Sequence, residues 1–372
     1  MFGRTYRKLK PKEFTAMPQI ESWTEGRQSC FVLPSPSDYS IDDSIVLPFK
    51  MGGNVSGLCG GQYVPENHTL RGLTTAILWH GDNRSPAIEM QGVEQIVERL
   101  TIVDAPIGIL LHKPVVGVCT GKSVVRDVWL TDCEVGVQCG YVEEEDNCDT
   151  LSLDRVFFHG CLESCVKLVN ADSTGHRVPG CWFLSTDTDC FLIEGGGDLW
   201  VDSSTVVAAK CLLRIAGRRA ITGRNGSYVF DKIKIDAQAG PGFELLRMDN
   251  PVPANIVFRD CHVACDEYEK NNGRMFTVQG AAALTVDNFY GLQPGVVEWH
   301  YKSRTGPSDI PNMVFCRSRL QGVVDACDIL NASDSTGPAH VVVRDCYNEN
   351  GEPVEDFSGV VSGDNKENQN GK

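Results

Sequence analysis

Lys234, Asp236 and His262 are the residues whose types and spacing best suit chemistry in this chain. Lys234 and His262 lie 28 positions apart, which is the period of a repeat described below, and Asp236 follows Lys234 by two positions. Residues two apart in a strand point to the same side, and stacked strands lie about 4.8 Å apart. The three side chains would then bring a base, an acid and a cation together, so they are the candidate catalytic residues. The alternative is a solvated polar face.

Three aromatic residues, Trp129, Phe157 and Trp182, hold the position of Lys234 in earlier repeats. Rings that project from one face at strand spacing form a flat apolar strip, on which the C–H faces of sugars can stack. These are the candidate substrate-binding residues, and a polymer along this face could stack at one end and react at the other. The alternative is that a cap, a turn or a neighbouring subunit covers the rings, because contiguous exposed apolar patches are unusual in monomers.

The elements that must position these residues form an internal repeat. Similar segments are SVVRDVWLTDC at 123–133, LSLDRVFFHGC at 151–161, NIVFRDCHVAC at 255–265 and HVVVRDCYN at 340–348. Their alignment gives an anchor column, at intervals of 23 to 29 residues: Leu100, Val128, Val156, Cys181, Ser204, Ile233, Cys261, Phe289, Ser318 and Cys346. The column three residues earlier is apolar in every repeat: Val97, Val125, Leu153, Val178, Val201, Phe230, Phe258, Val286, Phe315 and Val343.

Apolar residues recur at a period of two within short stretches of each repeat, which is typical of strands. Helical repeats need longer segments with apolar residues three and four apart, and this sequence lacks them. We therefore predict an all-β fold, a right-handed parallel β-helix solenoid of about ten coils. Residues 1–58 are expected to form an N-terminal leader and cap, 59–350 the β-helix, and 351–372 a polar, disordered C-terminal tail.

The two positions before each anchor carry charges whose sign often alternates between repeats, as in Arg126-Asp127 and Asp154-Arg155. Unlike charges on neighbouring strands attract and like charges repel. We interpret these pairs as a device that fixes the register of the coils and not as catalytic residues.

The 16 cysteines include no CxxC pair, and most fall at positions expected to be core. Cys133 and Cys161 share a small-residue corner column with Ala105, Thr186 and Ala209. Free cysteine packs as a small apolar residue, so we predict buried, reduced thiols and synthesis in a reducing compartment.

The formal net charge of −15 disfavours nucleic acid as a partner, because phosphates would be repelled. No apolar run reaches the roughly 18 residues of a membrane span, and the N-terminus of this chain does not read as a secretory signal. The localisation is otherwise open.

The coil pattern and the stretch Gly60-Gly61-Gln62-Tyr63-Val64 resemble the pectin-lyase-like family of right-handed parallel β-helices, over residues 59–350. That family contains polysaccharide lyases, polygalacturonase-like hydrolases, epimerases, esterases and phage tailspikes. The polygalacturonase motifs NTD, DD, GHG and RIK do not transfer. Their nearest echoes are Ser185-Thr186-Asp187, Gly175-His176-Arg177 and Lys232-Ile233-Lys234, in the wrong order and without a DD pair. The resemblance thus implies the fold, and it does not choose the function.

Two function classes remain open from the sequence. The first is a carbohydrate-recognising β-helix protein with a polysaccharide or oligosaccharide partner, acting as a lyase or a glycoside hydrolase if it is an enzyme. The second is a non-catalytic structural β-helix of the phage or virion spike type, with a homotrimer as its expected assembly. We expect no cofactor; the run Glu143-Glu144-Glu145-Asp146 is interpreted as a solvated loop, with weak calcium binding as the alternative.

Overall fold

The computed structural model describes residues 84–363 with gaps at 113–118, 142–146, 171–172, 218–225, 237–241, 265–274, 293–294, 302–309, 324 and 331–334, and several strands before residue 80. The described residues are almost entirely β-strand, with one short 3₁₀ turn at Ala326–Ile329. The chain divides into two units, Met1–Thr188 and Asp189–Lys372, and each is considered separately.

In the first unit, most strands belong to two parallel sheets, and β10 and β14 pair separately. One sheet contains β6 (Asn67–Trp79), β8 (Ile96–Val103), β11 (Val124–Arg126), β12 (Trp129–Thr131), β15 (Ser152–Asp154), β16 (Phe157–His159), β18 (His176–Pro179) and β19 (Trp182–Leu184). The other contains β5 (Ile45–Leu47), β7 (Pro86–Met90), β9 (Ile107–Leu111), β13 (Val135–Cys139) and β17 (Ser164–Leu168). The short pair is β10 (Cys119–Gly121) with β14 (Asn147–Asp149).

Each strand pairs with the equivalent strand of the next repeat. Val124 lies beside Ser152 and Trp129 beside Phe157, both 28 residues further along the chain. This register is what stacked coils require: a coil such as 124–139 adds two short strands, β11 and β12, to the first sheet and one, β13, to the second.

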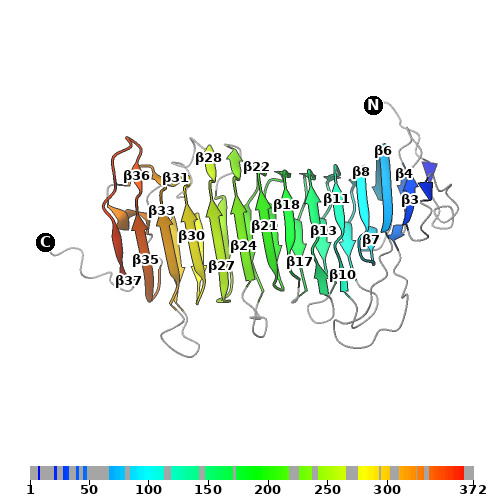
Figure 1. Ribbon diagram of the computed structural model, residues 1–372. Coiled ribbons are helices and arrows are strands. Elements are labelled where there is room, and N and C mark those ends of the chain that lie inside the picture. The colour runs from blue at the N-terminus through cyan, green and yellow to red at the C-terminus, as the bar shows by residue number, and fades with distance from the viewer. Residues whose placement is uncertain are drawn as a thin grey trace. The chain divides into compact units, whose positions relative to one another are not determined.

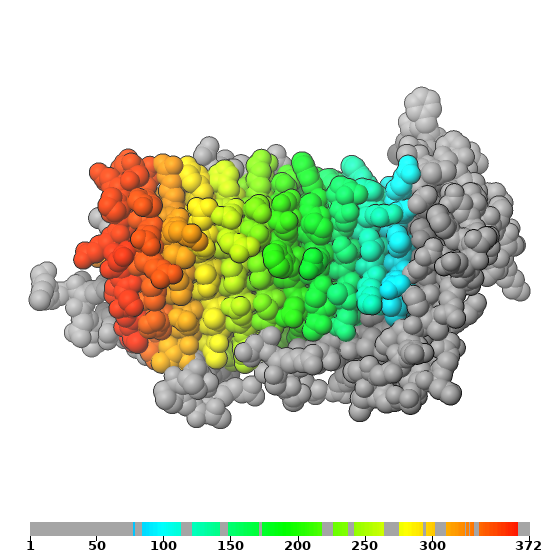
Figure 2. Space-filling model, in the orientation of Figure 1, coloured from blue at the N-terminus to red at the C-terminus, as the bar shows by residue number. Residues whose placement is uncertain are grey.

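The second unit repeats this arrangement. One sheet contains β21 (Asp198–Asp202), β22 (Thr205–Ala208), β24 (Gly226–Asp231), β25 (Lys234–Asp236), β27 (Ala254–Arg259), β28 (His262–Ala264), β30 (Ala283–Asp287), β31 (Tyr290–Leu292), β33 (Asn312–Cys316), β34 (Arg319–Leu320), β35 (Pro338–Arg344), β36 (Tyr347–Asn348) and β37 (Phe357–Ser362). The other contains β20 (Asp189–Ile193), β23 (Cys211–Ile215), β26 (Glu244–Met248), β29 (Phe276–Gln279) and β32 (Val297–His300). Figure 1 shows β24, β27 and β30 as neighbouring parallel strands. In Figure 2 the described coils of each unit form adjacent bands of surface in chain order.

A left-handed residue makes the bend before every anchor position. The φ angles lie between 49° and 66° at Arg99, Asp127, Arg155, Gly180, Ser203, Lys232, Asp260, Asn288, Arg317 and Asp345. Residues other than glycine seldom adopt this conformation. Here the ladder continues through the bend: the amide of Asp127 donates to the carbonyl of Asp154 (3.0 Å), and the amide of Asp260 to that of Asp287 (3.0 Å). The bend thus turns the chain between two strands without losing pairing to the next coil.

The core consists of the predicted apolar columns. All ten anchor residues and all ten residues three positions earlier are buried. Rings stack along the core at strand spacing: the Phe158 and Phe183 centroids lie 5.1 Å apart in the first unit, and those of Phe230 and Phe258 lie 5.0 Å apart in the second. Stacked aromatic pairs add to the stabilisation from burial alone.

The corner column is correct at Cys133 and Cys161, which are buried, and wrong at Thr186, which is exposed. Ser185 is buried instead, and its Oγ accepts a hydrogen bond from the amide of Cys161 (3.0 Å). Ser185 follows the anchor Cys181 by four positions, whereas Cys161 follows Val156 by five, so an alignment at fixed offset misplaces this corner.

Parallel pairing begins before residue 59 and strand structure continues beyond 350, unlike the segments expected from the sequence. The strands β3 (Gln28–Val32) and β4 (Tyr39–Ile41) pair in parallel with β6. The remaining early strands are β1 (Arg7–Lys8), which pairs with β4, and β2 (Glu21–Ser22), which pairs with β3. Within the segment assigned to a disordered tail, β37 pairs antiparallel with β35, so polar composition alone was a poor guide at 357–362.

No helix among the described residues is long and apolar enough to cross a membrane.

Candidate functional site

Three aromatic side chains lie in a row on the surface of the first unit. Trp129 on β12, Phe157 on β16 and Trp182 on β19 are neighbours in the strand register. The Trp129 and Phe157 ring centroids lie 4.2 Å apart with planes 33° apart, and those of Phe157 and Trp182 lie 6.2 Å apart at 32°. The side chains of Trp129 and Trp182 are 53% and 50% exposed, and Phe157 is half-buried. No described part of the chain therefore buries the two indoles, and the three rings form one contiguous row. We call these three residues the aromatic strip.

An imidazole borders the aromatic strip. His159 follows Phe157 by two positions on β16, is exposed, and stacks with the Phe157 ring at a centroid distance of 6.3 Å and an angle of 16°. Thr131 and Leu184 are its neighbours on β12 and β19. Sequence reasoning missed His159, although the two-residue offset that connects Lys234 with Asp236 would have found it.

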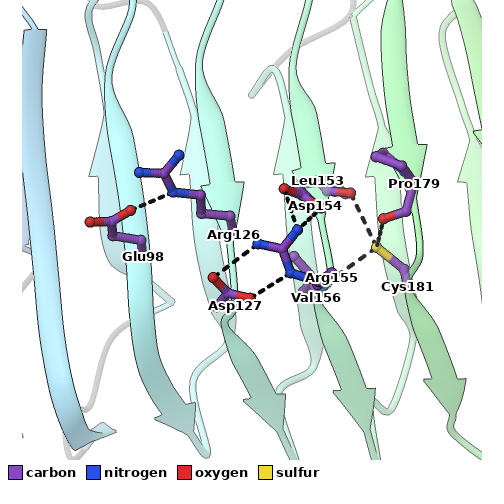
Figure 3. Close-up of polar contacts among 9 residues, drawn as sticks. All are labelled: Glu98, Arg126, Asp127, Leu153, Asp154, Arg155, Val156, Pro179 and Cys181. Atoms are coloured by element: carbon purple, nitrogen blue, oxygen red, sulfur yellow. Dashed lines mark hydrogen bonds and ion pairs between the residues drawn. The ribbon is translucent and has the colours of Figure 1, made fainter.

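Ion pairs fix the bends beside the aromatic strip, as Figure 3 shows. Arg155 donates from Nε and Nη2 to Asp127 in the preceding coil (2.8 and 3.1 Å) and from Nη1 to Asp154 (2.8 and 2.9 Å). Hydrogen bonding to this guanidinium holds the pKa of Asp127 below its usual range. Arg126 pairs with Glu98, whose side chain is buried.

Unlike charges pair at the same bends in the second unit. Asp231 pairs with Arg259, Asp287 with Arg317, and Asp202 with Lys232. Hydrogen bonds from Arg259 and Arg317 lower the pKa values of Asp231 and Asp287. These contacts support the interpretation of the alternating charges as a structural ladder.

The candidate catalytic residues lie on two adjacent strands of the second unit. Lys234 on β25 and His262 on β28 are direct neighbours in the register, and both are exposed. Asp236 ends β25 beside Ala264 and is half-buried. The two strands thus bring the three residues onto one face, at the neighbouring positions that the repeat predicts.

The row that begins with Lys234 and His262 continues through residues that sequence reasoning missed. Tyr290 on β31, Arg319 on β34 and Tyr347 on β36 are successive register neighbours of His262, and all three are exposed. The His262 and Tyr290 centroids lie 4.8 Å apart at 65°, and the Arg319 guanidinium carbon lies 5.0 Å from the Tyr290 centroid. The signal was available, because all three directly follow anchor residues. The row offers cations and π faces to a ligand.

In the described part of the chain, no three or more His, Cys, Asp and Glu side chains gather closely enough to hold a metal ion. The run from Glu143 to Asp146, the hypothetical calcium loop, lies outside the described residues.

No protein-family model matches the sequence, and no curated protein matches it. Among the solved structures that resemble the fold are the following two. The A-module of mannuronan C-5 epimerase AlgE4 from Azotobacter vinelandii superposes with a TM-score of 0.52 at 10% identity, covering 89% of this chain and 84% of that one. The catalytic unit of the GH87 α-1,3-glucanase from Streptomyces thermodiastaticus gives 0.50 at 11% identity, covering 92% of this chain. The fold is a parallel β-helix. This chain spans 63% of the length of the glucanase unit, which is less than two thirds. At 10% and 11% identity, the likeness to both structures shows the fold alone.

Proposed function

We propose that this β-helix is a carbohydrate-binding protein whose aromatic strip stacks against the sugar rings of a polysaccharide or oligosaccharide. The observation that carries the proposal is the half-exposed state of Trp129 and Trp182 on either side of Phe157. Leaving contiguous apolar rings in water is unfavourable, and such patches mark binding surfaces. The members of the strip come from neighbouring strands of one sheet, so their exposed surfaces form one continuous apolar row for successive sugar rings to contact.

The two solved structures with the same fold support this class of ligand. Their names describe an epimerase of mannuronan and a glucanase of α-1,3-glucan, both of which act on polysaccharides. Residue roles do not carry over at 10% and 11% identity, so the support extends to the ligand class.

We propose further that Lys234, Asp236 and His262 carry any catalytic activity. Glycoside hydrolysis uses a pair of carboxyl groups, and Asp236 is the one carboxylate on β25 and β28. Proton abstraction by Lys234 or His262, as in a polysaccharide lyase, fits these two strands better, with Asp236 as the acid partner. An unsaturated product absorbing in the ultraviolet would report lyase activity. Its absence in every glycan tested, with binding retained, would leave the chain as a binding protein.

Binding is tested with an oligosaccharide array, followed by calorimetry on the best ligand. Trp182→Ala and Trp129→Ala should each weaken binding by about tenfold, since stacking on one ring accounts for roughly 1 kcal/mol or more. Trp200→Ala is the matched control, because Trp200 is similarly exposed on β21 in the other unit. If no glycan binds, or the control weakens binding equally, the proposal is wrong. A trimer in sedimentation would then favour the structural alternative, with the strip as an assembly contact.

A further inference from the structure

Two arginines lie side by side on the second sheet of the Asp189–Lys372 unit, on strands other than those of the Lys234 row. Arg214 on β23 and Arg247 on β26 are register partners on adjacent parallel strands. Both bind one carboxylate: Asp249 Oδ2 accepts from Arg214 Nε (2.8 Å), and Asp249 Oδ1 accepts from Arg247 Nε (3.0 Å). One aspartate thus holds two guanidinium groups in fixed positions at neighbouring coils.

Two cations at strand spacing repel each other, so their pairing needs compensation. Asp249 supplies part of it, and the almost fully buried Asp189 supplies more by accepting from Arg214 Nη1 (3.3 Å). Burial raises the pKa of Asp189. Burial also disfavours the charged form of Arg214, but the hydrogen bonds that Arg214 donates to Asp249 and Asp189 outweigh this effect and raise its pKa. Arg214 therefore stays charged.

The contacts with Asp249 leave most guanidinium donors unused. A guanidinium carries five N–H groups, and Arg247 uses only the one on Nε in the described part of the chain. Arg214 uses Nε and one N–H of Nη1. The side chains are 33% and 40% exposed, so solvent and ligands can reach the remaining donors.

A buried hydroxyl without a partner adjoins the arginine pair. Thr277 on β29 is the register neighbour of Arg247, and its Oγ1 is buried with no hydrogen-bond partner among the described residues. Asp189 Oδ1 is in the same state at the other end of the cluster. An unsatisfied buried polar group is costly, which makes such atoms rare unless a ligand or water completes them.

We propose that Arg214, Arg247 and Thr277 form a binding site for an oxyanion group: a carboxylate, sulfate or phosphate carried by a ligand. The preset fork of donors matches two oxygens of such a group, and the Thr277 hydroxyl supplies a further donor. Asp249 is the positioning residue, because it orients both guanidiniums from behind. The site lies in a different unit from the aromatic strip and stands independently of the proposed carbohydrate function.

The test is a titration of the full chain at low ionic strength, followed by the arginine Nε–Hε signals in NMR spectra. The probes are inorganic sulfate, trigalacturonate as a carboxylate on a sugar chain, and maltotriose as a neutral sugar of equal length. We expect sulfate and trigalacturonate to shift the Arg214 and Arg247 signals, and maltotriose to leave them unchanged. Tighter binding of trigalacturonate than of sulfate would identify a sugar-borne anion as the source, whereas equal binding would identify the free anion.

Arg247→Lys keeps the charge opposite Asp249 but loses the fork, so it should weaken sulfate binding at least fivefold while the protein stays folded. Thr277→Val should weaken it severalfold. The control Arg344→Gln removes an exposed arginine from β35 and should change nothing. The proposal is overturned if neither anion binds the wild type, or if Arg344→Gln and Arg247→Lys have equal effects. Because sulfate contains no sugar ring, its result does not depend on the aromatic strip.

Discussion

His176 should make the stability of the protein depend on pH in a narrow acidic range. Its ring is buried in the first unit, where Nδ1 accepts from the amide of Leu151 (3.2 Å) and Nε2 contacts the Ser173 hydroxyl. Burial lowers its pKa from the ordinary 6.5 to about 4. The folded state therefore binds the proton less readily than the unfolded state does. The resulting stabilisation is complete above pH 6.5 and is lost as the pH falls toward 4.

The size of the effect follows from the two pKa values. Integrating the difference in proton binding from pH 7.5 to pH 4.5 gives a loss of roughly 2 to 3 kcal/mol from this residue alone. The measurement is urea denaturation at several pH values for the wild type and for His176→Asn, whose amide oxygen can still accept from Leu151. Carboxylates titrate in both proteins, so the difference between the two curves isolates His176.

The wild type should lose roughly 2 to 3 kcal/mol more than His176→Asn over this range. His159→Asn is the control, because it makes the same substitution at an exposed ring in the same unit. Parallel curves for the wild type and His176→Asn would refute the reasoning, because the buried ring would then be titrating as it does in the unfolded chain.

Two further predictions concern the ion pairs at the bends and the cysteine thiols. Asp154→Ala should change the free energy of unfolding by less than about 1 kcal/mol, as for exposed ion pairs. Arg126→Ala should lower it by more, because this change removes the cation beside the buried Glu98. Equal urea midpoints for the two variants would argue against this difference, and neither change should affect glycan binding. The cysteines should not form disulfides. Eleven cysteines have side chains placed in the described part of the chain, and all eleven are buried thiols outside any disulfide. Burial raises the pKa of Cys181 and Cys261 to about 12. Alkylation of protein denatured without reductant should modify most of the 16 cysteines; mostly disulfide-bonded cysteines would overturn the packing described for them.

The repeat was predictable because burial selects residue type at every coil. A position such as Val125 or Phe258 must be apolar wherever a strand faces the core, so the column survives variation in spacing. The outward column after the anchor was likewise predictable in place, and it correctly put Trp129 and Lys234 on exposed faces.

The bends were not predictable in the same way. Left-handed backbone usually signals glycine, yet Lys232 and Arg317 adopt it here, because the ladder through the bend and the ion pairs stabilise the conformation. Residue type therefore gave no warning of it. The burial of Glu98 depends on packing between coils, and the shift from Thr186 to Ser185 depends on the length of one coil. The arginine pair at Arg214 and Arg247 lies in a sheet that the repeat alignment did not include.

A crystal structure of the chain with the best oligosaccharide from the array tests the central claim most directly. The account predicts a sugar ring stacked on the Trp129 or Trp182 indole at van der Waals distance, about 4 Å, with the chain of sugars running from strand to strand along the aromatic strip. An oligosaccharide bound elsewhere, with both indoles in contact only with water, would contradict it.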